Sequence, residues 1–208
     1  MQQLVPEGWD ISSPAAGPVA GFNVAVVLID SFSITDSEGK PGAPFRGAVL
    51  AIPAKKKGAV SPITMVVYGI TAREGVPGAY GNYVPGLASI ERRESFSSDG
   101  KASADESWSF KAEDGNVVDV HVEYERGRPA QSKIEMQVHS GAKPDFFPIY
   151  RVNQVAEILR STATGVDRIS KFSFKASGAK LQPLFDGTER LIGVISTPSY
   201  SRTIFLPD

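Results

Sequence analysis

The fold depends on the stretch Pro77-Gly78-Ala79-Tyr80-Gly81-Asn82-Tyr83-Val84-Pro85-Gly86, which lies between two strand-like runs. Glycine permits positive φ and close approach of the backbone, and proline fixes φ and removes a hydrogen-bond donor. A segment constrained in this way is either a rigid bend between strands or the wall of a site. Tyr80, Asn82 and Tyr83 are the polar side chains that such a bend presents.

Short runs of β-branched or alternating residues, bounded by turns, lie on both sides of the bend. In the most regular run, Val117–Glu125, valines at even positions alternate with Asp119, His121 and Glu123. Alternation with a period of two predicts a half-buried strand. The strands that we expect are Phe22–Asp30, Phe45–Ile52, Ile63–Thr71, Leu87–Phe96, Ser103–Lys111, Val117–Glu125, Lys133–His139, Asp167–Ala176, Leu191–Ser196 and Thr203–Leu206. The chain is therefore predicted to be mainly β.

One segment departs from this period. Between Tyr150 and Ser161 the apolar residues recur at helical spacing, as Val152, Val155 and Leu159 show. This pattern predicts an amphipathic helix, ended by the glycine at position 165.

The length of 208 residues and the apolar fraction of 41% predict one domain with a sizeable core. Residues 1–21 are rich in proline and glycine, so we expect an irregular lead-in, with Trp9 as its anchor in the core. No break in composition marks a linker, and a single domain over residues 1–208 is the prediction.

The formal net charge of −1 removes the electrostatic argument for nucleic acid or an anionic membrane surface as a partner. The longest apolar run, Val24–Ile29, is far shorter than the ~20 residues of a membrane helix. The N-terminus lacks the basic and long apolar regions of a signal peptide. We therefore expect a soluble cytoplasmic protein with no membrane partner.

The sequence has no cysteine, which excludes disulfides, thiolate catalysis and sulfur-ligated metal sites. The Gly-x-Gly-x-x-Gly, Walker, Gly-x-Ser-x-Gly and His-Glu-x-x-His motifs are also missing from it. Kinase, dinucleotide-binding and serine-hydrolase functions thus gain no support. We expect no cofactor and no metal.

The run Lys55-Lys56-Lys57-Gly58 has two interpretations. It is a solvated turn between strands, or it supplies an amine that forms a Schiff base. The second interpretation needs a lysine that is desolvated or beside another cation, so that its pKa falls toward neutrality.

Two other groups of charged or titratable residues also have two alternative interpretations each. Arg73 and Glu74 form a surface pair, or they flank a cavity mouth as substrate clamp and as acid or base. His121 and His139 fall on the polar faces of successive strands. These faces are either solvated, or they form a polar patch in which a histidine beside carboxylates acts as a base or binds a metal.

The order of these segments resembles the acetoacetate decarboxylase superfamily over most of the chain. The resemblance rests on the lead-in, the strands, the glycine- and aromatic-rich bend and the closing Leu87-Ala88. It implies a closed antiparallel β-barrel, shaped like a double cone, with an internal cavity and one or two short helices. The bend of that family carries a lysine pair, whereas Val84, Pro85 and Gly86 stand here. Schiff-base decarboxylation therefore does not carry over.

Bend and resemblance together predict a cavity enzyme, of lyase, dehydratase or cyclase/isomerase type, acting on a small carbonyl or polyketide-like substrate of secondary metabolism. Tyr80, Asn82 and Tyr83 would stabilise a developing oxyanion. Glu74 or His121 would move a proton. The expected substrate-binding residues are Arg46, Arg73, Glu91 and Trp108.

Two alternatives stay open. One is a non-catalytic barrel that binds a small apolar ligand, and the other is an interaction domain without a cavity. Because strand edges invite pairing, a homo-oligomer is compatible with all three.

Overall fold

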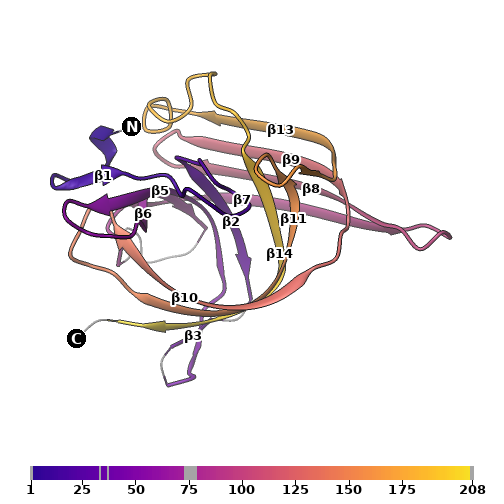
Figure 1. Cartoon of the computed structure of the whole chain (residues 1–208), viewed down its shortest axis with the longest axis horizontal. Helices are drawn as coiled ribbons and strands as arrows, with labels where there is room; N and C mark the ends of the chain where they lie inside the picture. The colour runs from indigo at the N-terminus through magenta and orange to yellow at the C-terminus, as the bar shows by residue number, and fades with distance from the viewer. Residues whose placement is uncertain (1, 33, 37, 73–78, 207–208) are drawn as a thin grey trace.

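The computed structural model describes residues 2–32, 34–36, 38–72 and 79–206. These residues form one large sheet, and their only helical element is a 3₁₀ turn, η1 (Gln2–Leu4). The strands, most of them labelled in Figure 1, are β1 (Trp9–Ile11), β2 (Ala25–Ser31), β3 (Ile34–Asp36), β4 (Pro41–Gly42), β5 (Phe45–Lys56), β6 (Ile63–Thr71), β7 (Tyr83–Phe96), β8 (Ala102–Ala112), β9 (Val117–Glu125), β10 (Ala130–Ser140), β11 (Ile149–Ser161), β12 (Val166–Asp167), β13 (Ile169–Ser177) and β14 (Gly193–Phe205).

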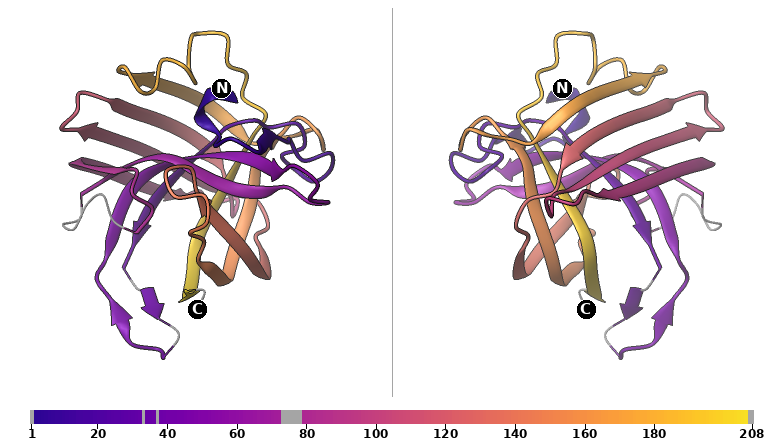
Figure 2. Two further views of the ribbon diagram at one scale, coloured as in Figure 1. Left: turned by 90° about the vertical axis from the view of Figure 1, so that its left-hand side faces the viewer. Right: turned by 90° about the vertical axis from the view of Figure 1, so that its right-hand side faces the viewer.

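Strand β6 is the point at which the sheet divides. One of its edges pairs with β5, while residues 64–66 of the other edge pair with β10 and residues 69–71 pair with β7. Two wings result: the β7 wing, of β7, β8, β9 and β13, and the β10 wing, of β10, β11, β14, β3 and β4. In Figure 1 the wings curve into a nearly closed, barrel-shaped sheet, and the side views of Figure 2 show the β7 wing running across the top.

The prediction of a mainly β fold is confirmed, and most neighbouring strands are antiparallel. The pairs β6–β7, β6–β10 and β14–β3 are parallel, however, so the sheet is mixed. The division at β6 needs Gly69, because a Cβ there would lie 2.5 Å from two ring carbons of Tyr83. The predicted internal cavity stays a prediction.

Strand β5 is buried on both faces over most of its length, as its continuous apolar sequence favours. On one face Leu50 and Ile52 join the largest core cluster, together with Trp108 and Phe110 of the β7 wing. On the other face Val49 packs in a smaller cluster that reaches the β10 wing. The central strands therefore separate two apolar layers, one under each wing.

The helix predicted between Tyr150 and Ser161 is wrong, because this segment forms β11 (Ile149–Ser161), paired with β10 and β14. Its register against β14 shifts twice: the first shift adds a residue to β14, between Ser196 and Ser199, and the second adds one to β11, between Ile158 and Arg160. An inserted residue changes the phase of the alternation along a strand. Val152 and Leu159 are seven positions apart and both buried, and Leu159 lies at the second shift. An interrupted period of two can therefore resemble helical spacing in the sequence.

The N-terminal lead-in is not irregular throughout, because it contains η1 and the short strand β1, which pairs with β5. Trp9 is 8% exposed and packs with Val5, Ala54 and Met65, which confirms it as an anchor. The two strands predicted near the C-terminus are instead one strand, β14, which runs through Pro198.

Candidate functional site

Two arginines from different strands converge on one buried carboxylate. Arg46 on β5 donates from Nε to Asp30 on β2 at 2.9 Å, and Arg92 on β7 donates from Nη1 to the other carboxylate oxygen at 2.9 Å. The Asp30 side chain is 7% exposed, against 47% for Arg46 and 40% for Arg92. With Ala88 and Ile90 they line a pocket of about 330 Å³, the arginine pocket. Asp30 thus holds the two guanidinium groups at a solvent-accessible surface.

The strand registers explain this arrangement. Asp30 lies opposite Arg46 in the β2–β5 pair, so their side chains share one face of the sheet. Ala88, Ile90 and Arg92 occupy alternate positions of β7 and share the face that packs toward β5. The pocket forms where these two faces meet.

Below the pocket, a polar network continues into the β7 wing. The guanidinium of Arg92 lies 4.4 Å from the ring centre of Trp108, a cation–π contact, and its Nε is 3.7 Å from Glu106. Glu106 also accepts hydrogen bonds from Trp108 Nε1 at 3.0 Å and from the hydroxyl of Tyr124 at 2.7 Å. Burial raises the pKa of Tyr124, so this hydroxyl keeps its proton and acts as a donor.

Tyr80, Tyr83 and Tyr150 form a second candidate site, the tyrosine corner. The hydroxyls of Tyr80 and Tyr150 share a hydrogen bond of 2.5 Å, and the ring centres of Tyr80 and Tyr83 are 5.9 Å apart. The guanidinium of Arg202 lies 4.6 Å from the Tyr150 ring centre. Burial raises the pKa of all three tyrosines, so they are protonated donors rather than bases at neutral pH.

Asn82 fixes the corner to β6. Its Nδ2 donates to the carbonyl oxygen of Val66 at 2.7 Å, while its buried Oδ1 accepts no hydrogen bond from the described residues. The ring of Phe146 packs edge-on against Tyr80, with 5.6 Å between centres, and belongs to a surface pocket of about 380 Å³ formed by residues 143–146. The corner therefore lies one aromatic layer below a solvent-accessible hollow.

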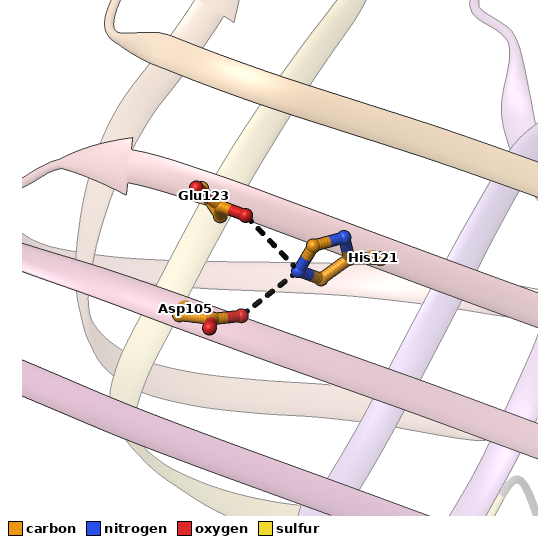
Figure 3. Close-up of side chains that lie close together, drawn as sticks. All are labelled: Asp105, His121 and Glu123. Carbon is orange, nitrogen blue, oxygen red and sulfur yellow. Dashed lines mark hydrogen bonds and ion pairs between the residues drawn. The ribbon is translucent and has the colours of Figure 1, made fainter.

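A third group of polar side chains lies on the solvent-facing side of the β7 wing. His121 and Glu123 are neighbours on one face of β9, and Asp105 lies opposite Glu123 on β8. His121 Nε2 is 2.9 Å from an Asp105 oxygen and 3.6 Å from a Glu123 oxygen (Figure 3). Lys171 Nζ, from β13, lies 3.1 Å from the same Glu123 oxygen.

The structure divides the predicted site residues among these groups. Arg46 and Trp108 belong to the arginine pocket and the network beneath it. His121 and Glu91 lie on the outer face of the β7 wing, on either side of Ser107. The remaining predicted residues are Tyr80, Asn82 and Tyr83 at the tyrosine corner, and Arg73 and Glu74, which lie outside the described residues.

Two further interpretations can now be compared with the structure. His139 does not lie on a solvated face: it is 9% exposed and stacks on Phe147 at 4.6 Å between ring centres. The reason is that the end of β10 pairs with β6 and is covered by the N-terminal segment through Trp9. Lys56 and Lys57 are exposed at the end of β5, as the turn interpretation expects.

Sequence reasoning missed Asp30, Arg92 and Tyr150. The first two had a usable signal, because each continues an alternating apolar series: Asp30 follows Val26 and Leu28 in phase, and Arg92 follows Ala88 and Ile90. A charge in phase with inward-facing residues indicates a buried partner. Tyr150 had no such signal, since its segment was assigned to a helix.

Comparison of this chain with protein family models, with curated proteins and with solved structures gave no match. Among the residues that the structure describes, no helix has both the length and the apolar character needed to cross a membrane.

Proposed function

We propose that the protein binds a small molecule with a carboxylate group and a compact apolar body in the arginine pocket. The convergence of Arg46 and Arg92 on the buried Asp30, at the edge of a pocket of about 330 Å³, supports this proposal. Two guanidinium groups fixed side by side suit a planar anion, because each offers several N–H donors in a rigid fork.

The rest of the pocket fits this class of ligand. Ala88 and Ile90 provide an apolar wall next to the cationic heads. Trp108 lies against Arg92 and limits the orientations of its guanidinium. The carboxylate of Asp30 offsets one of the two guanidinium charges, and the partly exposed guanidinium groups retain N–H donors that the ion pairs do not use.

Titration of the full chain with benzoate and hexanoate, followed by protein NMR or calorimetry, tests this proposal. Saturable binding is expected for both acids, and their uncharged analogues benzamide and hexanol should bind much more weakly. Arg46→Gln should lower the affinity for benzoate about tenfold or more, since a hydrogen bond to a charged group contributes about 1.5 kcal/mol or more.

Arg151→Gln is the matched control. Arg151 is an exposed arginine that pairs with Glu135 on the β10 wing, away from the pocket residues. Its replacement should leave benzoate binding unchanged. Equal binding of the charged and uncharged probes, or equal effects of Arg46→Gln and Arg151→Gln, would contradict the proposal.

Catalysis on a small carbonyl compound is the second candidate, and the protonated tyrosine corner favours it. Hydroxyls that keep their protons in a buried site are suited to stabilise an oxyanion. The probe is acetoacetate, whose loss of CO₂ through an enolate is followed by NMR against the rate in buffer. A rate equal to that in buffer, or a rate that Tyr80→Phe leaves unchanged, would remove the corner from catalysis.

A further inference from the structure

Asp105, His121 and Glu123 lie on two neighbouring strands in the middle of the β7 wing (Figure 3). His121 and Glu123 are two residues apart on β9, so they share a face, and Asp105 is the direct cross-strand neighbour of Glu123. Both strands are paired on both edges, β8 with β7 and β9, and β9 with β8 and β13. The backbone therefore fixes the positions from which the three side chains project.

The three ligand atoms have the spacing of a metal-binding set. His121 Nε2 lies 2.9 Å from Asp105 Oδ1 and 3.6 Å from Glu123 Oε1, and the three atoms all lie within 4.8 Å of one another. Ligands of a tetrahedral Zn²⁺ ion, with bonds of about 2.0–2.2 Å, are separated by about 3.3–3.6 Å. Small rotations of the side chains would bring all three atoms to such distances.

The charges at this place also favour a cation. Asp105 and Glu123 lie directly opposite each other, and like charges in that arrangement destabilise a sheet. The single ammonium of Lys171 contacts Glu123, and the hydrogen bond of His121 reaches Asp105. A divalent ion between the three side chains would neutralise both carboxylates at once.

We propose that Asp105, His121 and Glu123 bind one divalent cation of the Zn²⁺ class. An imidazole nitrogen beside two carboxylate oxygens suits Zn²⁺ better than Ca²⁺ or Mg²⁺, which prefer oxygen ligands alone. The side chains are 45%, 25% and 38% exposed, respectively, so the ion is reached from solvent and keeps a position for water or another ligand. The arginine pocket lies on the opposite face of the β7 wing, and neither proposal depends on the other.

Calorimetric titration of the chelator-treated full chain with ZnCl₂ tests the site. One equivalent should bind, and Ca²⁺ should bind far more weakly. Loss of even an outer partner of a metal ligand commonly costs about 10- to 100-fold in affinity. His121→Asn, Asp105→Asn and Glu123→Gln should each weaken Zn²⁺ binding by about tenfold or more, with the far-UV circular dichroism of the metal-free proteins unchanged.

Asp119→Asn is the matched control, because Asp119 lies on the same face of β9 and bonds to Ser109 instead. It should leave Zn²⁺ affinity unchanged. Lys171→Met should raise the affinity, since it removes the cation that competes for Glu123. The proposal is overturned if Zn²⁺ does not bind, if His121→Asn binds it as well as the wild type, or if Asp119→Asn or Lys171→Met loses as much affinity as His121→Asn.

Discussion

At the scale of single residues, Asp114 connects the β8–β9 turn to two other parts of the chain. It accepts hydrogen bonds from the hydroxyl of Tyr68 on β6 at 3.0 Å and from Nδ2 of Asn116 at 2.7 Å, and it pairs with Lys180 at 3.1 Å. Burial alone would raise the pKa of Asp114. The hydrogen bonds from Asn116, Lys180 and Tyr68 outweigh burial and lower this pKa below its usual range.

Asp114 should therefore make folding depend on pH in the acid range. A carboxylate with a lowered pKa in the folded state contributes stability that is complete above its unfolded value of about 3.9 and disappears as pH falls through the folded value. Asp114→Asn should cost about 1–2 kcal/mol of unfolding free energy at pH 7. Below pH about 4, the variant should lose less stability than the wild type.

Urea denaturation between pH 2.5 and pH 7 measures both effects. Tyr68→Phe removes one donor and should reduce the acid dependence only in part. Parallel pH profiles for the wild type and Asp114→Asn would show that Asp114 has no such role.

The residue scale also shows what the sequence can say about a site. Arg46 and Trp108 were expected near a ligand, and the structure brings both into one charged network. Asp30 and Arg92 connect these two residues, because the face of β2 that carries Asp30 meets the face of β7 that carries Arg92. This contact between the two faces follows from strand pairing over long sequence distances, which no local pattern encodes.

At the scale of elements, β11 shows where periodicity fails. A bulged strand and an amphipathic helix can place apolar residues at the same sequence intervals, because the bulge changes the phase of a period of two. Glu157 lies between the two register shifts of β11 and is 2% exposed. Residue spacing does not reveal this burial, because an acidic residue at position 157 also suits the polar face of an amphipathic helix.

Glu157 ties the two wings together, and its loss should be costly. Its carboxylate pairs with Arg126 Nε at 2.6 Å and accepts a hydrogen bond from the amide of Gly127 at 2.7 Å. Breaking one partner of a buried ion pair leaves an uncompensated charge. Because Arg126 keeps Glu94 as a second partner, Glu157→Gln should lower the unfolding free energy by about 2–4 kcal/mol.

Glu135→Gln on β10 provides the comparison. Glu135 is 57% exposed and pairs with Arg151, and exposed pairs contribute about 0–1 kcal/mol. Chemical denaturation of both variants should separate them clearly. Similar losses would mean that burial of Glu157 does not set the strength of its ion pair.

At the scale of the whole molecule, the sequence predicts strands and a barrel-like sheet but not the division at β6. Most of the expected strands coincide with observed ones, and Ile63–Thr71 and Val117–Glu125 do so residue for residue. The parallel pairing of β6 with β10 joins segments more than 70 residues apart. Such pairings depend on the topology of the complete chain, so alternation within a strand cannot reveal them.

The shared central strands imply that the described parts of the chain unfold together. Trp9 packs on Ala54 of β5 and Met65 of β6, whereas Trp108 packs in the cluster that contains Leu50 of β5 and Ile70 of β6. Both tryptophan environments are therefore built on the same two strands. In Trp9→Phe and in Trp108→Phe, the fluorescence of the remaining tryptophan should therefore change at the same urea concentration as the far-UV circular dichroism of that variant.

Each comparison is made within one protein, so differences in stability between the variants do not affect it. If the Trp9 signal changed at a clearly lower urea concentration than the dichroism, the N-terminal lead-in would be a separate unit, and the single domain predicted for residues 1–208 would have to be divided.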